Sequence, residues 1–291
     1  MTGGRDLNRR DFLRLSATGA GALTAGWAGA QEAAPSFRFS TSTVMYPDSP
    51  FEVAIDEIAK TGCEAVDLWD APSNPVNHMD WVWKRRPALL RVFLENCGLK
   101  LFSFSIYWSP GNELLERLEW LAEAGGQVAV LGGGAAVGQP VSAGIAALEQ
   151  LATRAEALGI RIAGENHGGS SLSTIASLRE FARLAASPNL GIALAPYHVM
   201  GEGESVAEAI RAGGPKLFFL YAWQQAPGMA ELPGDGTLDF LPVLRALRQV
   251  KYAGYLNLFT HTHVPRDQMT PAVIKSRQYL EGLLAQLGGE P

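Results

Sequence analysis

Short apolar runs alternate with longer helix-like stretches along most of the chain, and this alternation restricts the fold more than any other feature. Eight such runs occur between residues 37 and 259, and most of them follow a Gly-containing turn. They cover residues 37–41, 65–69, 101–105, 128–131, 160–164, 190–194, 217–221 and 255–259. Apolar strands alternating with helices are typical of a parallel sheet buried on both faces. Eight units of this kind predict a (β/α)8 TIM barrel, a fold of about 250 residues.

A doubly wound open sheet is the alternative fold for alternating strands and helices. If it bound a dinucleotide, it would need a Gly-rich fingerprint after the first strand. Residues 43–47, which follow the first apolar run, read TVMYP and contain no glycine. No linker or change in composition divides the chain after residue 30. We therefore expect a single barrel domain over residues 31–291.

The first 30 residues predict an export signal. Arg9 and Arg10 precede a modestly apolar run from Leu15 to Ala28, and a small-x-small pattern ends at Ala30. This order resembles a twin-arginine (Tat) signal peptide, which is removed from the mature protein. A membrane anchor is the alternative, but the run is too short and too rich in Gly and Ala to span about 30 Å of hydrocarbon. We expect a periplasmic or secreted protein without membrane contact after signal cleavage.

Composition excludes several classes of protein. The formal net charge is −5 and charged residues make up 18% of the 291 residues. Because there is no basic excess to neutralise phosphates, nucleic acid is not an expected partner. The low charge content permits a homo-oligomer. Two cysteines cannot build a disulfide scaffold or a Cys-rich zinc site, and whether Cys63 pairs with Cys97 stays open.

Histidines gather at one predicted edge of the fold. Four of the five fall at or just beyond the carboxyl ends of the fifth, sixth and eighth runs, namely His167, His198, His261 and His263. The carboxyl ends of all strands share one rim in a parallel barrel, so these side chains are expected to converge with Glu165. Imidazoles beside a carboxylate are suited to metal binding or to proton transfer.

Three segments carry a resemblance to a known family. They are ENHGG at residues 165–169, SPNLGI at 187–192 with the following chain to His198, and GTLDF at 236–240 with YAGY at 252–255. Together they resemble the xylose isomerase-like barrels, also called the sugar phosphate isomerase/epimerase family. The resemblance covers most of the chain after residue 30. It implies a divalent metal held by Glu, Asp, His and Glu on strands five to eight, and two carboxylates that move a proton beside a substrate carbonyl.

The chain departs from this family pattern at three of the four metal positions. Glu165 matches the first position, whereas Ala195, Tyr221 and Phe259 stand at the other three. His198 matches a substrate-contacting histidine that follows the missing Asp. Hard ions such as Mg²⁺ and Mn²⁺ need several oxygen ligands, so one carboxylate beside an apolar wall would hold them poorly.

Two interpretations of the metal site stay open. In the first, a ligand set is rebuilt from Glu165, His198 and His261 together with His263 or His167, and it binds a divalent metal. The nitrogen-rich set favours Zn²⁺ or another transition metal, with Mn²⁺ as the ion closer to the family pattern. In the second, the site holds no metal, and Glu165 and the histidines act as general acid and base or contact the sugar.

Aromatic residues are also expected near the rim, where flat rings can cover the C–H faces of a sugar. The predicted substrate contacts are His167, Trp69, Trp108, Tyr221, Trp223 and Arg266. The glycines at 132–134 fit no standard phosphate-binding motif and have no Lys or Arg within their loop. A neutral sugar is therefore favoured over a sugar phosphate, and Arg266 is the one nearby cation that would reverse this preference.

The sequence as a whole predicts an exported isomerase or epimerase that abstracts a proton next to the carbonyl of a carbohydrate. Glu165 is expected to be the base, and His198 to polarise or protonate an oxygen. One alternative is a non-catalytic sugar-binding barrel, which would explain the lost ligands. Another is a lyase or hydrolase that acts on oxidised glycosides through the same enolate chemistry. Fold alone does not choose among these functions.

Overall fold

Eight parallel strands close into a barrel in chain order, and the last strand pairs with the first. The computed structural model describes residues 37–107 and 111–288. The strands are β1 (Arg38–Ser42), β2 (Ala65–Trp69), β3 (Lys100–Ser105), β4 (Val128–Gly132), β5 (Arg161–Glu165), β6 (Leu190–Leu194), β7 (Leu217–Ala222) and β8 (Tyr255–Leu258). The predicted TIM barrel is confirmed, and each strand begins and ends within one residue of the predicted run.

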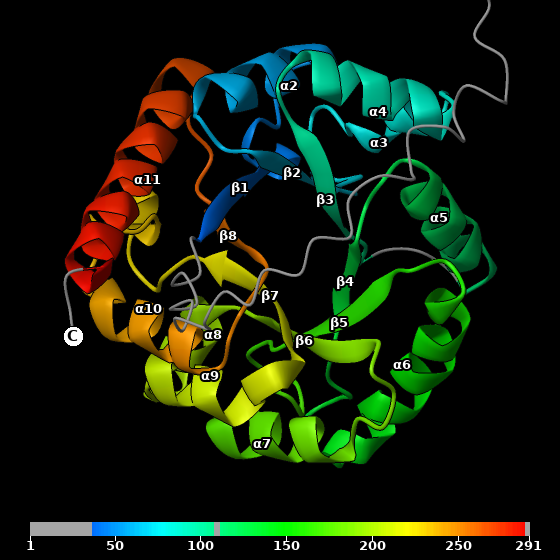
Figure 1. The fold of residues 1–291 in the computed structure, drawn as a ribbon, viewed down its shortest axis with the longest axis vertical. Coiled ribbons are helices and arrows are strands. Elements are labelled where there is room, and N and C mark those ends of the chain that lie inside the picture. The colour runs from blue at the N-terminus through cyan, green and yellow to red at the C-terminus, as the bar shows by residue number, and fades with distance from the viewer. Residues whose placement is uncertain (1–36, 108–110, 289–291) are drawn as a thin grey trace, which may run out of the picture. The chain divides into compact units, whose positions relative to one another are not determined.

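Helices form a ring outside the strands (Figure 1). They are α2 (Phe51–Lys60), α3 (Met79–Val82), α4 (Pro87–Asn96), α5 (Gly111–Glu123), α6 (Val141–Glu156), α7 (Ile175–Leu184), α8 (Pro196–Gly201), α9 (Val206–Gly213), α10 (Phe240–Gln249) and α11 (Arg266–Gly288). Short 3-10 turns are η1 (Thr43–Met45), η2 (Gly214–Lys216) and η3 (Gly228–Glu231). None of the helices in the described ranges is both long and apolar enough to cross a bilayer.

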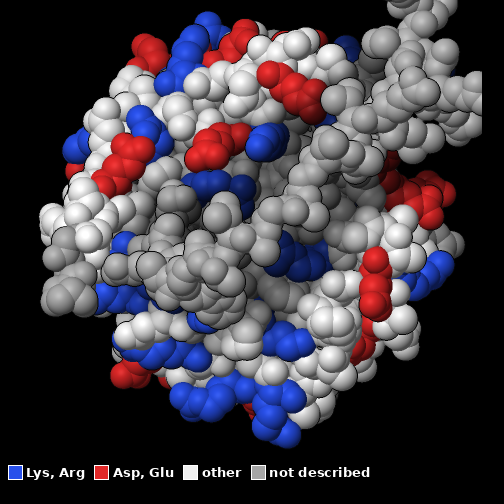
Figure 2. Space-filling model, viewed as in Figure 1, with Lys and Arg blue, Asp and Glu red and all other residues white. Residues whose placement is uncertain are grey.

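Burial explains why the strands read as apolar runs. Every residue of β2, β6 and β7 is buried, because one face of each strand points into the barrel and the other packs under the helices. The helices are amphipathic instead. In α5, Leu118 and Leu121 lie on one face of the helix and are fully buried. Acidic and basic side chains lie around the outer ring in the view of Figure 2.

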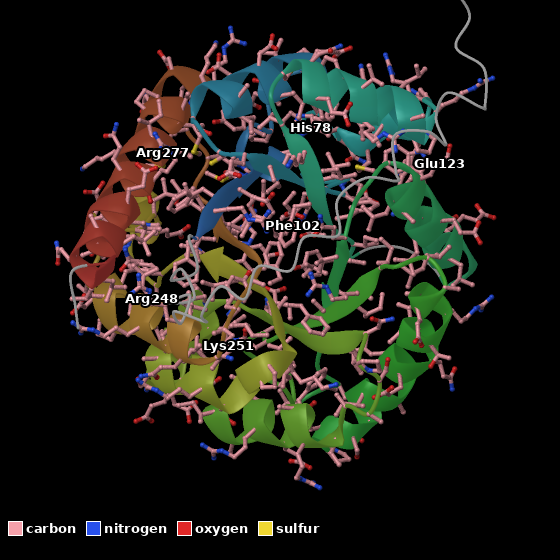
Figure 3. The ribbon with its side chains drawn as sticks, in the orientation of Figure 1. His78, Phe102, Glu123, Arg248, Lys251 and Arg277 are labelled. Carbon is pink, nitrogen blue, oxygen red and sulfur yellow. The ribbon has the colours of Figure 1, made fainter. Side chains whose placement is uncertain are left out.

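The barrel interior has an aromatic layer below a polar layer. Phe102 of β3 packs against Phe219 of β7 and Tyr255 of β8, with ring centroids 5.7 Å and 4.7 Å apart. Figure 3 shows Phe102 inside the ring of strands. Tyr221 and Asn257 lie two residues nearer the carboxyl ends of β7 and β8 and are also fully buried. The aromatic layer thus closes the barrel beneath the polar side chains.

Some predictions fall outside what the structure describes. The predicted signal segment at residues 1–30 and the predicted substrate contact Trp108 both lie outside the described residues. Cys63 and Cys97 are free thiols, so the disulfide that the sequence left open is not formed. Cys63 is buried.

Candidate active site

A cavity of about 510 Å³ opens at the carboxyl ends of the strands. It brings together side chains that are distant in the sequence. Its lining residues are Val44, Trp69, Ala71, Ser73, Asn74, Tyr107, Glu165, His167, His198, His261 and His263. The predicted base and the four rim histidines thus share one cavity with Trp69, and both His167 and Trp69 are predicted sugar contacts. In TIM barrels the active site lies at this rim.

Glu165 is the last residue of β5, and its carboxyl lies in the cavity although the side chain is 5% exposed. The Tyr107 hydroxyl donates a hydrogen bond to Glu165 Oε2 at 2.7 Å. Burial raises the pKa of Glu165 to about 7, against the effect of the Tyr107 hydrogen bond and in the same direction as the nearby charge of Asp67. A carboxyl with this pKa can both accept and return a proton near neutral pH.

The rings of His198 and His167 lie next to each other in the cavity lining. Their ring centroids are 4.1 Å apart. His198 is carried by the short helix α8 and is half-buried, and this burial, with His167 and His261 beside it, lowers the pKa of His198 to about 4. His198 is therefore a neutral imidazole at pH 7. It can donate a hydrogen bond from one ring nitrogen to a substrate oxygen without carrying charge.

An aromatic wall closes one side of the cavity. Trp69 stacks on Phe259 with ring centroids 4.9 Å apart and planes within 10°. Trp223 meets the edge of Phe259 at 5.2 Å, and its ring also lies 5.0 Å from that of His261. Trp69 presents its surface to the cavity, as expected of a sugar contact.

Two of the predicted sugar contacts lie behind this wall rather than in the cavity lining. Tyr221 is fully buried, and its hydroxyl lies 3.0 Å from the hydroxyls of both Tyr107 and Ser105. Trp223 is 4% exposed and donates its Nε1 hydrogen to Glu231 Oε2 at 3.1 Å. Both support the residues that line the cavity, and neither contacts its free space.

Arg266 occupies a different place from the one its predicted role needs. It lines a separate cavity of about 220 Å³ together with Tyr46 and Asp48. Among the described residues, neither Lys nor Arg lines the main cavity. The lining offers imidazoles, a phenol, a hydroxyl and an amide instead, which are hydrogen-bonding groups suited to a neutral polyol.

Residues 55–281 match the xylose isomerase-like TIM barrel family. The chain belongs to that family. No match was found among curated protein sequences. Similar solved structures were found, and three of them illustrate the range of proteins built on this barrel.

A D-psicose 3-epimerase crystallised in the presence of D-fructose is 17% identical, with a TM-score of 0.68 over 85% of this chain and 99% of that one. The IolI protein with a bound zinc atom is 14% identical, with a TM-score of 0.67 over 82% and 96% of the two chains. The probable 3-DHS dehydratase AsbF of Bacillus anthracis is 14% identical, with a TM-score of 0.65 over 81% and 97%. At these identities the likeness shows the fold alone.

The side chains of this xylose isomerase-like barrel do not fit the metal that the family pattern implies. Ala195, Tyr221 and Phe259, which stand at three ligand positions, are fully buried and offer no carboxylate or imidazole. Within residues 37–107 and 111–288, no three His, Cys, Asp or Glu side chains are grouped so that they could hold a metal ion. The expected ligands Glu165, His198, His261 and His263 line one cavity without forming such a group.

Among the buried carboxylates that sequence reasoning missed, two support the site. Asp67 is fully buried at the centre of β2, and its charge inside an apolar run was the available signal. Glu231 is also buried, and its Oε2 atom accepts hydrogen bonds from Thr260 Oγ1 at 2.6 Å and from the His261 backbone N–H at 2.9 Å, besides that from Trp223. Glu231 thereby ties the end of β7 to the loop after β8. No local pattern in the sequence indicates this contact.

Proposed function

We propose that this protein is an isomerase or epimerase that moves a proton next to the carbonyl of a neutral carbohydrate or keto-sugar. The observation that carries the proposal is the Glu165 carboxyl, which is buried at the cavity surface and has a pKa raised to about 7 by that burial. Such a group is a general base matched to neutral pH. The family membership and the sugar epimerase among the similar structures support the same reaction class.

Glu165 would take the proton from the carbon next to the carbonyl. As that C–H bond breaks, its electron pair forms a C=C bond and the carbonyl oxygen gains the negative charge. Tyr107 and neutral His198 line the same cavity and can donate hydrogen bonds to that oxygen. Protonated Glu165 then gives its proton to the former carbonyl carbon. The neighbouring hydroxyl loses its hydrogen and becomes the new carbonyl, and Tyr107 or His198 can pass that hydrogen to the former carbonyl oxygen, which becomes a hydroxyl.

The number of carboxylates favours isomerisation over epimerisation. Glu165 is the only Asp or Glu among the described residues that line the cavity. One base can move a proton between adjacent carbons on one face of the substrate. Inversion at a single carbon needs an acid on the opposite face, and an imidazole of the lining or Tyr107 would have to supply it.

The substrate we propose is uncharged and about the size of a monosaccharide or its derivative. A volume of about 510 Å³ lies within the usual range for small-molecule sites. Trp69 offers a ring for a sugar face, while Ser73 and Asn74 offer hydrogen bonds. We also propose that the protein acts in the periplasm or outside the cell, on the basis of the signal-like residues 1–30. Whether it forms a homo-oligomer stays a prediction.

Deuterium exchange tests the proposed reaction. The protein is incubated with a panel of ketoses and aldoses in D₂O, and incorporation of deuterium beside the carbonyl is followed by NMR. We expect exchange with at least one sugar and a loss of at least about 100-fold in Glu165→Gln. Glu123→Gln is the matched control, because Glu123 points outward from α5 (Figure 3). Exchange that survives in Glu165→Gln would show that the base is wrongly assigned.

A non-catalytic sugar-binding barrel is the second candidate. It is favoured by Ala195, Tyr221 and Phe259, which replace three ligands of the family pattern. Calorimetric binding of a sugar without any deuterium exchange would favour this candidate over the enzyme.

A further inference from the structure

A row of hydroxyl groups leads from Glu165 into the barrel and ends on Asp67. The Tyr107 hydroxyl lies 2.7 Å from Glu165 Oε2 and 3.0 Å from the Tyr221 hydroxyl. The Tyr221 hydroxyl lies 3.0 Å from Ser105 Oγ, which in turn lies 3.0 Å from Asp67 Oδ2. We call these five residues the proton chain. It joins the cavity to the polar layer inside the barrel through side chains of β2, β3, β5, β7 and the loop after β3.

The Asp67 carboxyl is fully buried and has no cationic partner within residues 37–107 and 111–288. Its hydrogen-bond partners are hydroxyls, with Ser42 Oγ at 2.8 Å from β1 and Ser103 Oγ at 2.8 Å from β3, in addition to Ser105. No Lys, Arg or His among the described residues perturbs the pKa of Asp67. An isolated buried carboxylate is costly, and such a group tends to keep its proton instead.

The number of hydrogen bonds in the proton chain sets the number of hydrogens that it must contain. Its five members make four oxygen–oxygen contacts of 2.7–3.0 Å, and each contact requires one hydrogen. The hydroxyls of Ser105, Tyr221 and Tyr107 supply three hydrogens. If both carboxyls were ionised, one contact would lack a hydrogen and two negative charges would be buried together. One carboxyl proton supplies the fourth hydrogen.

That single proton can be placed on either carboxyl. When it is on Asp67, the hydroxyls donate in order toward Glu165, which is then an ionised base. When it is on Glu165, all the hydroxyls turn and donate toward Asp67. Both arrangements satisfy all four contacts, so the chain can change direction without breaking its geometry.

We propose that Asp67 and Glu165 share one proton along this chain, and that Asp67 is the proton reservoir for the cavity. The sharing itself is a property of the free protein, whereas its role in turnover rests on the proposed function. In turnover, Glu165 would gain the proton from the substrate C–H bond, and Tyr107 would donate its hydrogen to the carbonyl oxygen. Tyr221, Ser105 and Asp67 would replace that hydrogen in sequence, which leaves Asp67 ionised. The protein gains one proton and loses one, so the charges balance at the neutral enediol.

This role would place an acid where the family pattern implies a metal. The carbonyl oxygen needs an electrophile when the C–H bond breaks, and the family residues for an ion are replaced by Ala195, Tyr221 and Phe259. Tyr221 itself stands at one of those positions and forms the middle of the chain. A phenol supplied with a proton from behind can serve as that electrophile.

The surroundings of both carboxyls agree with a retained proton. Burial raises the pKa of each of them to about 7, although the serine hydrogen bonds lower that of Asp67 and the Tyr107 hydrogen bond lowers that of Glu165. Around Asp67, the elements β1, β3 and β8 present Ser42, Ser103, Ser105 and Asn257, none of which titrates.

Around Glu165 the titratable groups are few. The phenols of Tyr107 and Tyr221 have pKa values raised well above 10.0 by burial, so they stay protonated. His198 has its pKa lowered by burial and is neutral, and His167, His261 and His263 complete the lining. No other acid in that lining competes for the shared proton.

Infrared difference spectroscopy of the substrate-free protein tests the shared proton. Spectra are recorded in buffer that contains a metal chelator, across a pH series centred near 7. Samples labelled with ¹³C-Asp or ¹³C-Glu assign each neutral-carboxyl band. We expect one neutral carboxyl to persist to about pH 7, with intensity divided between the Asp67 and Glu165 bands. In Asp67→Asn, the Asn amide donates toward Ser105 and fixes the chain toward an ionised Glu165. The Glu165 band should then disappear at least about one pH unit lower.

Two hydroxyl deletions provide matched comparisons. Tyr221→Phe removes a hydroxyl inside the proton chain, and Tyr255→Phe removes one outside it that accepts from Arg38. We expect Tyr221→Phe, but not Tyr255→Phe, to make the two carboxyls titrate separately. Ser105→Ala breaks the chain at the other end and serves if Asp67→Asn does not fold.

The shared proton and the proposed function can fail separately. If the Glu165 band is unmoved in Asp67→Asn, or if Tyr221→Phe behaves as Tyr255→Phe does, the shared proton is wrong. A stoichiometric metal in the purified protein, measured before the chelator is added, would also overturn it. If the infrared result is as expected and no sugar exchanges deuterium, the proposed function fails while the shared proton stands.

Discussion

At the scale of single residues, the environments of Glu165 and His198 set the pH at which the cavity can work. Glu165 must be ionised to act as a base, and burial raises its pKa to about 7. We therefore expect kcat/KM to fall about tenfold for each pH unit below that value. Because the pKa of His198 is lowered to about 4, His198 should add no step near its ordinary value of 6.5.

A pH profile of the deuterium-exchange rate checks this prediction. The control is His198→Gln, which should weaken substrate binding while it leaves the midpoint of the acid limb in place. A limb centred near 4.5, the ordinary pKa of a Glu carboxyl, would contradict the buried-base assignment. A limb that moves with His198→Gln would assign the titration to the imidazole instead.

The position of Glu165 could be predicted from the sequence, whereas the role of Asp67 could not. Glu165 could be placed at the cavity because a polar residue directly after a buried strand of a barrel must lie at the carboxyl rim. The role of Asp67 depends on which serines stand opposite it, and that is a matter of strand register. β2 pairs with β3 through a register shift between Val66 and Asp67, which aligns Asp67 with Ser103. A bulge of this kind has no signature in an apolar run.

At the scale of elements, the close approach of β4 and β5 holds Glu165 in place. A Cβ atom at Gly133 would lie 2.6 Å from the Gly164 carbonyl carbon and 2.8 Å from the Glu165 carbonyl oxygen, so only glycine fits there. Gly132, its neighbour, has nothing within 4 Å of the same position. Residues 132–134 thus allow close backbone packing at this edge, and three consecutive glycines in the sequence give no sign of the strand that lies beside them.

We predict that Gly133→Ala pushes the end of β5 away from β4. The expected cost is about 1–3 kcal/mol of unfolding free energy, together with a loss of exchange activity because Glu165 moves from Tyr107. Urea denaturation and the exchange assay measure the two effects. Gly132→Ala is the control and should change stability by less than about 1 kcal/mol. Equal behaviour of the two variants would show that the contact does not position Glu165.

At the scale of the whole molecule, the barrel could be predicted because eight buried strands leave few other closed arrangements. The arrangement of side chains inside the barrel could not be predicted, because they come from strands that are far apart in the sequence. Ser42 and Asn257 lie 3.0 Å apart in this polar layer although 215 positions separate them.

Asp67 should make the protein lose stability as the pH rises. Its pKa is raised from 3.8 to about 7 in the folded protein, chiefly by burial. A carboxyl with a raised folded-state pKa stabilises the fold fully below its unfolded pKa, and this contribution is lost as the pH rises through the folded value. Between pH 4 and 7 the folded state therefore holds a proton that the unfolded chain releases. Each pH unit in that window costs up to about 1.4 kcal/mol of unfolding free energy.

Asp67→Asn cannot keep the shared proton up to pH 7, so its stability relative to the wild type should improve between the pH at which Glu165 ionises in the variant and pH 7. Groups outside the proton chain titrate in both proteins and cancel in the difference. Urea unfolding at a series of pH values measures that difference directly, and Ser40→Ala, a change elsewhere in the polar layer, is the control that should run parallel to the wild type. Parallel curves for Asp67→Asn as well would mean that Asp67 is ionised throughout, and that the barrel stabilises a buried negative charge with serine hydroxyls alone.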